Sequence, residues 1–260
     1  MTDSVEPGAE LEVAWLGHAT NDIRLGGVRV LTDPVFRDRV AHLRRHSDPA
    51  TLDSGPVDAV LVSHLHHDHL DLPSLRRLPR GTPLVVPRGT AKLVARSAPG
   101  DVVEMVPGDV IDIGGMRVTA VEADHGPGRT GRRISGRPLG FVMEKDGRVV
   151  YFPGDTDLHE MMADLPAPDV ALLPIWGWGR SLGPGHLDPE RAAQAAALLR
   201  AGLVLPIHWG TFAPVGLRSS APAWLHQPAD RFREAMERHA PDTKLTVVAP
   251  GSGPVTIATA

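Results

Sequence analysis

A short apolar run at residues 59–63 leads directly into a cluster of polar residues, and this junction limits the folds open to the chain. A continuous apolar run of this length is typical of a strand that is buried on both faces, as in parallel sheets. The residues that follow have the pattern His-x-His-x-Asp-His. Alternation at a strand end places His64 and His66 on one side, and the turn beyond supplies Asp68 and His69. The sequence therefore predicts a buried strand with four metal-ligand side chains at its end.

Three other apolar runs also end at residues that can bind metals. The pairs of run and ligand are 118–122 with His125, 149–152 with Asp155, and 203–207 with His208. Loops at the carboxyl ends of strands form the active sites of α/β folds. Imidazole and carboxylate groups are the ligands that zinc accepts when no thiolate is available. We therefore expect a metal site where these strands end.

Composition narrows the chemistry further. The absence of Cys excludes disulfides, thiolate metal ligands and a Cys nucleophile, whereas 13 His residues offer metal ligands. The net charge of −4 argues against nucleic acid as a partner, because nucleic-acid binding requires a basic stripe. The polar start lacks a signal-peptide pattern, and no stretch approaches the length of apolar residues that spans a membrane. We therefore expect a cytoplasmic protein without stable membrane insertion.

Short runs rich in Val, Ile and Leu alternate with turn signals along the chain. Gly-Gly at 26–27 and Asp-Gly at 146–147 each separate two such runs, as expected of β-hairpins. Residues 189–201 form the clearest helix, because an Asp cap precedes them and Pro occupies the first position. A second helix is predicted at 228–239 from its 3.6-residue periodicity. Together these elements indicate two layered sheets with helices outside, and we interpret residues 1–260 as one domain.

The ordered motif set resembles that of the metallo-β-lactamase-fold hydrolases. The resemblance rests on His64-x-His66-x-Asp68-His69, His125, Gly154-Asp155-Thr156 and His208. It implies an α/β fold, an αββα sandwich of two mixed sheets with helices on the outer faces and a dinuclear site at one edge. It further implies a first metal held by His64, His66 and His125, a second held by Asp68, His69 and His208, and Asp155 as the bridge between them.

Four further motifs indicate which branch of this family the chain resembles. They resemble the branch that contains N-acyl-phosphatidylethanolamine phospholipase D and L-ascorbate 6-phosphate lactonase, and they lie at residues 15–20, 32–36, 185–190 and 208–212. Only residues 37–49 stand where that phospholipase has a longer loop, which argues against a membrane phospholipid as substrate. Nothing in the chain resembles an amphipathic helix that docks on membranes.

The resemblance implies a dinuclear zinc-dependent hydrolase that directs a metal-bridging hydroxide at a phosphodiester or lactone-type ester. Two Zn²⁺ are the expected cofactors, with Mn²⁺ or Fe as alternatives, because His/Asp sites bind several metals. Asp68, Asp155 and His186 are the expected catalytic residues. The expected substrate is a small anionic molecule, and a homo-oligomer is one option for the assembly.

Further residues are expected around the metals. His18, His186 and Trp178 would line the substrate pocket, and Asp33 and Thr156 would hold ligand side chains in place. Three of these residues have a structural alternative. Asp33 can form a simple Asp-Pro turn, His186 can belong to the cap of the helix that follows, and Trp178 can pack under that helix.

Two basic runs could recognise phosphate or carboxylate, because the planar guanidinium group pairs with both. We interpret both runs as solvated loops, and we expect His67, which has no ligand role in the motif, to be exposed. The runs are Arg129, Arg132, Arg133 and Arg137, and Arg37, Arg39, Arg44 and Arg45.

Two other functions are open. One is a different reaction on the same fold, such as thioester or β-lactam hydrolysis or iron-dependent redox chemistry. The other is a metal-binding module without catalysis, against which the complete set of seven ligands argues.

Overall fold

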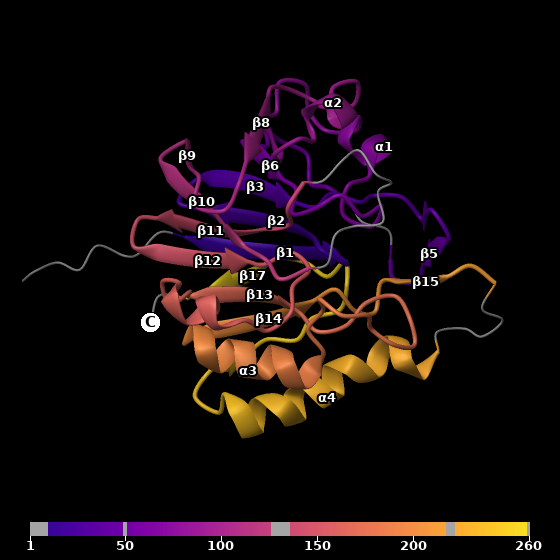
Figure 1. The fold of residues 1–260 in the computed structure, drawn as a ribbon, viewed down its shortest axis with the longest axis vertical. Coiled ribbons are helices and arrows are strands. Elements are labelled where there is room, and N and C mark those ends of the chain that lie inside the picture. Colours follow the sequence, from indigo (N-terminus) through magenta and orange to yellow (C-terminus); the bar gives the residue numbers. More distant parts are fainter. Residues whose placement is uncertain (1–9, 49–50, 126–135, 217–221, 259–260) are drawn as a thin grey trace, which may run out of the picture.

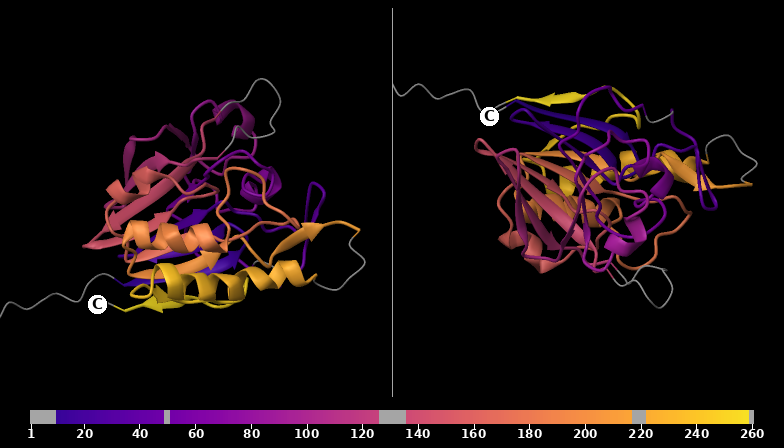
Figure 2. Two further views of the ribbon diagram at one scale, coloured as in Figure 1. Left: turned by 60° about the horizontal axis from the view of Figure 1, so that its bottom comes forward. Right: turned by 90° about the horizontal axis from the view of Figure 1, so that it is seen from above.

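Two seven-stranded sheets packed face to face form the body of the computed structural model, which describes residues 10–48, 51–125, 136–216 and 222–258. Helices α3 (Pro189–Leu199) and α4 (Ala223–His239) lie side by side on one outer face (Figures 1 and 2). The short helices α1 (Leu72–Leu75) and α2 (Ala91–Val94) lie at the opposite end of the molecule (Figure 1). This layering is an αββα sandwich and confirms the predicted fold class.

The first sheet has the strand order β17-β1-β2-β3-β6-β7-β8. Its strands from β17 to β3 pair antiparallel, and those from β3 to β8 pair parallel, so the sheet is mixed. The strand bounds are β1 Leu11–Gly17, β2 Thr20–Leu25, β3 Val28–Thr32, β6 Ala59–Leu61, β7 Leu84–Pro87, β8 Val102–Met105 and β17 Val255–Ile257.

The second sheet has the strand order β16-β14-β13-β12-β11-β10-β9. It is also mixed, because β9 to β12 pair antiparallel and β12 to β16 pair parallel. The strand bounds are β9 Val110–Ile113, β10 Met116–Glu122, β11 Leu139–Lys145, β12 Arg148–Phe152, β13 Val170–Pro174, β14 Leu203–Ile207 and β16 Lys244–Leu245.

Alternation along the buried strands divides the core into two parts. In β6, Leu61 joins the cluster between the two sheets, whereas Val60 joins the cluster beneath α1 and α2. Both side chains are fully buried, as the continuous apolar run predicts. The second sheet likewise uses its other face to bury Phe232 and Met236 of α4. Strands such as β6 are therefore buried on both faces, and the ligand-type residues lie beyond their ends.

A small third sheet was not expected from the sequence. It consists of β4 (Arg39–Val40), β5 (Leu43–Arg45) and β15 (Phe212–Pro214), and it projects to one side of the sandwich (Figure 1). The prediction that all arginines of this segment are solvated is wrong for Arg45. Its side chain is buried, its guanidinium lies over the ring of Phe212 at 4.8 Å, and it donates to the carbonyl of Val35 at 2.7 Å.

Other differences concern element ends. Both predicted hairpins are present, but β9 and its Gly-Gly turn into β10 were missed, because β9 is a half-exposed edge strand. Helix α4 begins at Ala223, five residues before the predicted start, and Pro228 lies inside it. No helix among the described residues is long and apolar enough to cross a bilayer.

Candidate metal centre

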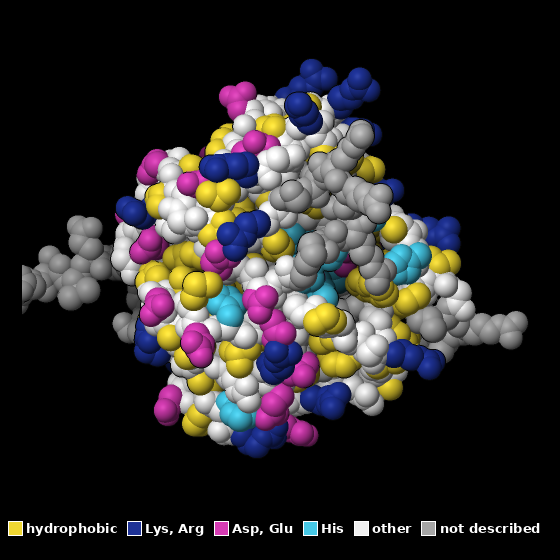
Figure 3. Space-filling model, in the orientation of Figure 1, with side chains coloured by type: hydrophobic (Ala, Val, Ile, Leu, Met, Phe, Trp, Pro, Cys, Tyr) yellow, Lys and Arg dark blue, Asp and Glu magenta, His cyan; other side chains and the backbone are white. Residues whose placement is uncertain are grey.

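Seven ligand-type residues meet at one edge of the sandwich, where strands from both sheets end. The loop after β6 carries His64, His66, Asp68 and His69, whereas His125, Asp155 and His208 follow β10, β12 and β14 of the second sheet. Ligand atoms within each of two groups lie within 4.8 Å of one another: His64, His66, His125 and Asp155, and His18, Asp68, His69 and His208. Histidine side chains also gather near the middle of the face shown in Figure 3. The structure thus brings together all seven predicted ligands.

Asp155 lies between the two groups. Its Oδ1 is 3.1 Å from His208 Nε2, and its Oδ2 is 3.3 Å from His69 Nε2 and 3.9 Å from His64 Nε2. Its side chain is almost fully buried. Asp155 therefore has oxygens near both groups, as expected of a bridging ligand.

In four of the imidazole rings, the nitrogen that faces away from the site lies near an oxygen that can accept a hydrogen bond. The Nδ1 atom lies 2.7 Å from an Asp33 oxygen in His69, 2.7 Å from the Gly185 carbonyl in His125, and 2.7 Å from the Trp176 carbonyl in His208. In His64 it lies 3.0 Å from Ser63 Oγ. We assign the proton to Nδ1 in each ring, which leaves the Nε2 lone pair directed into the site.

This donor set fits a divalent metal. His69 Nε2 and His208 Nε2 are 3.1 Å apart, and with both protons on Nδ1 these atoms present two lone pairs to each other. His64 Nε2 and His125 Nε2 likewise lie 2.9 Å and 3.2 Å from His66 Nδ1. A divalent cation would satisfy lone pairs held this close beside buried carboxylates, and Zn²⁺ is one that accepts imidazole and carboxylate together.

Electrostatics at the site favour an ionised Asp155 and neutral imidazoles at His66 and His208, whereas they favour a protonated imidazole at His69. Burial lowers the pKa of His208 to about 3 and that of His66 to about 4. Burial by itself would raise the pKa of Asp155, but the neighbouring His208 and His69 outweigh it and hold that pKa well below its usual value. Burial also lowers the pKa of His69, but the Asp155 and Asp33 carboxylates outweigh it and raise that pKa well above its usual value. These carboxylates attract positive charge to the site.

Glycine at position 154 allows the loop after β12 to approach the motif loop. Gly154 has φ +63°, and a Cβ atom there would lie 2.4 Å from Ser63 Cβ. Both the left-handed backbone and the close approach therefore require glycine. The arrangement places Asp155 directly against the loop that carries His64.

The residues that were predicted to surround the ligands make different contacts in the structure. Asp33 contacts His69 as expected, whereas the Thr156 hydroxyl bonds to the backbone: it accepts from the Asp124 amide and donates to the Asp157 carbonyl. Thr156 thus braces the backbone beside His125. His67 is exposed, as expected.

His18 and His186 occupy different depths. His18, predicted to line the substrate pocket, is buried: its side chain is 1% exposed and its Nε2 lies 2.9 Å from Asp68 Oδ2. His186 is partly exposed, with Nε2 3.5 Å from Asp155 Oδ2 and its ring 4.7 Å from that of His125. Trp178 packs edge-on against His42 at 4.8 Å, beside the small sheet.

Two arginines of the basic runs pair with carboxylates outside the ligand set. Arg137 forms an exposed ion pair with Glu122, and Arg37 pairs with Asp71. Arg129, Arg132 and Arg133 lie outside the described residues. For Arg137, the interpretation as a solvated residue is therefore confirmed.

Comparison with known proteins identifies the class. A family model described as "Beta-lactamase superfamily domain" matches residues 28–209, which include all seven candidate ligands. The chain therefore belongs to the β-lactamase superfamily of metal-dependent hydrolases, as the motif set predicts. A solved structure of "a novel metallo hydrolase" from the archaeon Ignicoccus hospitalis has the same fold, with a TM-score of 0.73 and 24% identity over 96% of this chain and 100% of that one.

Relatives with closer sequences refine this placement. A "UPF0173 metal-dependent hydrolase" of Nitratidesulfovibrio vulgaris is 34% identical over 93% of this chain and 94% of its own length. "N-acyl-phosphatidylethanolamine-hydrolyzing phospholipase D 1" of Caenorhabditis elegans is 29% identical over 90% of this chain and 72% of its own. An uncharacterized protein of Mycobacterium tuberculosis is 32% identical over 88% of this chain, which spans only 65% of that relative. The phospholipase branch that the motifs resemble is thus represented among the relatives.

Proposed function

We propose that the protein is a dinuclear metal-dependent hydrolase that cleaves a phosphodiester or lactone-type ester in a small anionic substrate. The observation that carries the proposal is the convergence of seven nitrogen and oxygen ligands in two groups, with Asp155 between them. Two divalent ions bound there would lower the pKa of a shared water and polarise the scissile bond. Zn²⁺ is the proposed metal, since imidazole and carboxylate suit it, and the cytoplasm is the proposed location.

The residues of the chain would hold the metals and orient the reactants. His64, His66 and His125 would bind the first metal, and Asp68, His69 and His208 would bind the second. Asp155 would bind both and so fix their separation. The partners of the outward nitrogens, such as the Trp176 carbonyl, keep each ring in the orientation and tautomer that a metal needs.

His186 is proposed to protonate the leaving group. Its imidazole is partly exposed and lies at the rim of the site. Its Nε2 lies 3.5 Å from Asp155 Oδ2, and its Nδ1 lies within hydrogen-bonding distance of the carbonyls of Gly183 and Pro184. A general acid must reach both solvent and the bond that breaks, and this position offers both. Trp178, at the side of the site, is proposed as a substrate contact.

The choice of bond draws on the relatives. The phospholipase from C. elegans, by its name, hydrolyses an N-acyl-phosphatidylethanolamine, which contains a phosphodiester. We infer the same bond class for this chain, with lactones as a second class because a metal pair can polarise a carbonyl in the same way.

The first test combines metal analysis with a substrate panel. The purified protein should contain about two equivalents of metal, and the zinc-loaded form should hydrolyse a phosphodiester or a lactone in a panel that also includes N-acyl phospholipid, thioester and β-lactam. Turnover that is absent with zinc and appears on iron loading would overturn hydrolysis in favour of redox chemistry. Two bound metals without turnover in any loaded form would indicate a binding module.

The second test uses two adjacent histidines. His66→Ala should reduce kcat/KM by more than the roughly 10–100-fold that loss of an outer partner costs, because it removes a ligand. His67→Ala is the matched control, since His67 is exposed and has no ligand role, and its kcat/KM should stay at the wild-type value. Equal activity of the two variants would contradict the assigned site.

A further inference from the structure

His18 lies outside the predicted ligand set but is built into the site. It occupies the turn between β1 and β2 in the left-handed conformation, with φ +53°. Its carbonyl accepts from Trp15 Nε1 at 2.8 Å and from the His208 amide at 2.9 Å, and its own amide donates to Thr211 Oγ1 at 2.7 Å. The turn of the first sheet is thus bonded directly to the loop of the second sheet that carries His208.

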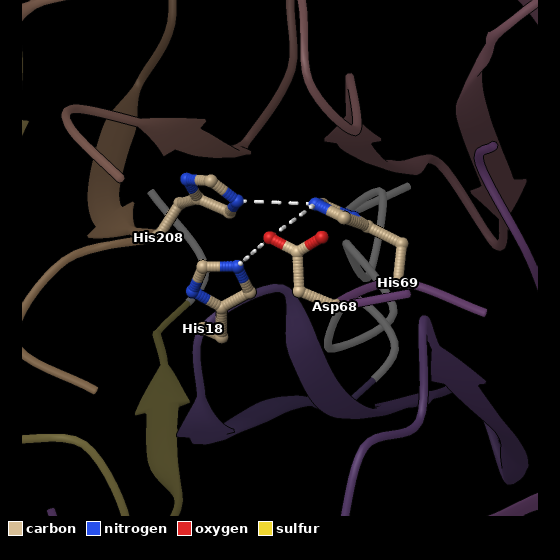
Figure 4. A group of neighbouring side chains, drawn as sticks. All are labelled: His18, Asp68, His69 and His208. Carbon is tan, nitrogen blue, oxygen red and sulfur yellow. Dashed lines mark hydrogen bonds and ion pairs between the residues drawn. The ribbon is translucent and has the colours of Figure 1, made fainter. Parts of the chain in front are cut away.

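The side chain of His18 joins two candidate ligands. Its Nε2 lies 2.9 Å from Asp68 Oδ2, and its ring packs against that of His208 with centroids 3.8 Å apart (Figure 4). The edge of Phe212 closes the other side at 5.2 Å. With the side chain 1% exposed, water does not compete for these contacts.

We propose that His18 is a positioning residue for the second metal, which rests on the ligand set of the proposed function. Its Nε2–H donates to Asp68 Oδ2, which also lies 4.0 Å from His69 Nε2, and this bond fixes the orientation of the carboxylate toward the metal. An Nε2 atom that donates its proton has no lone pair in the ring plane for a metal, so His18 supports the ligand without being one. Its ring and carbonyl hold His208 at the same time.

The proposal predicts a selective effect. His18 contacts Asp68 and His208, which belong to one group of ligands, and its ring lies 5.5 Å from that of His69 in the same group. The other group is positioned by Ser63 and the Gly185 carbonyl. Loss of the Nε2–H donor should therefore weaken one metal site and spare the other.

The test compares two substitutions in the full chain. His18→Gln keeps an N–H donor near the position of Nε2, whereas His18→Phe keeps an aromatic ring against His208 and Phe212 but has no donor. Zn²⁺ affinity at each site would be measured by competition with a chromophoric chelator, with His66→Ala and His208→Ala to assign the two sites. Thermal unfolding of the metal-free variants would report the structural contribution, and X-ray absorption of the zinc-loaded forms would count imidazole ligands.

The expected result is a loss of 10–100-fold in Zn²⁺ affinity at the Asp68/His69/His208 site for His18→Phe, and a loss several-fold smaller for His18→Gln. Wild-type affinity at both sites in His18→Phe would overturn the proposal. Equal losses in both variants, matched by equal losses of thermal stability, would assign His18 a purely structural role. A lower imidazole count in His18→Phe would make it a ligand instead. Wild-type protein that binds fewer than two metals would instead refute the dinuclear site itself.

Discussion

At the scale of single residues, one buried carboxylate organises the motif loop. Asp33 follows β3 with φ +36°, and its side chain is fully buried. One oxygen accepts from the Ser63 amide at 2.7 Å, and the other accepts from Ser63 Oγ at 2.6 Å and from His69 Nδ1 at 2.7 Å. The same group therefore sets the path of the loop and the tautomer of a candidate ligand.

Asp33→Asn should weaken metal binding without emptying the site. The amide is close in size to the carboxylate, but an NH₂ group facing His69 Nδ1 cannot accept a hydrogen bond from it. The His69 tautomer with its proton on Nε2 is then favoured, and the Nε2 lone pair is no longer free to bind a metal. We expect Zn²⁺ affinity to fall by roughly 10–100-fold at the site that uses His69, measured by chelator competition. Asp53→Asn is the control, because Asp53 forms an exposed ion pair with Arg24. Unchanged affinity in Asp33→Asn would contradict this role.

The sequence predicts those residues of the site that lie close together along the chain in a readable motif. The spacing of His64, His66, Asp68 and His69 is readable because all four follow one strand, and Asp33 was expected beside a ligand. The contact between His18 and Asp68 joins residues 50 positions apart. It depends on how the β1–β2 turn packs beneath the motif loop, and no local pattern reports that packing.

At the scale of elements, the strand ends position the chemistry. The parallel strands β12, β13 and β14 direct their carboxyl ends to one edge, and the loops after β12 and β14 supply Asp155 and His208. Long apolar strands such as these were predicted. The strands β4, β5 and β15 were not, because each has two or three residues and β5 contains two arginines. Their stability comes from tertiary packing, which overrides local propensity.

Gly154→Ala should lower the free energy of unfolding by more than the strain of a left-handed alanine, because the new Cβ atom would also clash with Ser63. Gly147→Ala is the matched control, since Gly147 also has positive φ but a Cβ atom added there would meet nothing within 4 Å. The control should lose about 1–2 kcal/mol of unfolding free energy for the left-handed backbone. Gly154→Ala should lose roughly 2 kcal/mol more, because Ser63 must move. Denaturant unfolding of both variants measures the difference, and equal losses would refute the steric argument.

Arg45→Ala should destabilise the small sheet. The buried guanidinium donates to the carbonyl of Val35 and covers Phe212, so its removal leaves a void and an unpaired acceptor. We expect a loss of roughly 2–4 kcal/mol in the free energy of unfolding. The neighbouring Arg44 is exposed, and Arg44→Ala should change the same quantity by less than about 0.5 kcal/mol. Similar values for the two variants would show that Arg45 contributes nothing by its burial.

At the scale of the whole molecule, the candidate metal centre joins the two sheets. His64, His66, Asp68 and His69 follow the first sheet, and His125, Asp155 and His208 follow the second. The unfolded chain cannot assemble such a site, so metal binding adds to the free energy of folding. The fold class was predictable because its signals repeat along the chain, whereas the bond from the His208 amide to the His18 carbonyl, which crosses between the sheets, was not.

Removal of metal should therefore lower the melting temperature. At a metal concentration 1,000 times Kd, each occupied site contributes about 4 kcal/mol to unfolding free energy. For a chain of this size that corresponds to a shift of roughly 8–16 °C per site. Calorimetry with and without a chelator measures the shift, and Asp155→Ala, which lacks the proposed bridge, should show a much smaller one. If the chelator left the melting temperature of the wild type unchanged, the proposal that bound metal links the two sheets would be contradicted.

The pairing of β17 with β1 has a consequence for synthesis on the ribosome. Val255–Ile257 form the edge strand that pairs with Leu11–Val13, so β1 waits for a strand that is translated after all the other described strands. Until then β1 presents an unpaired edge, which invites association with strands of other nascent chains. The two metal-binding groups, by contrast, are already translated once His208 has left the exit tunnel. Metal binding can thus precede the pairing of β17 with β1.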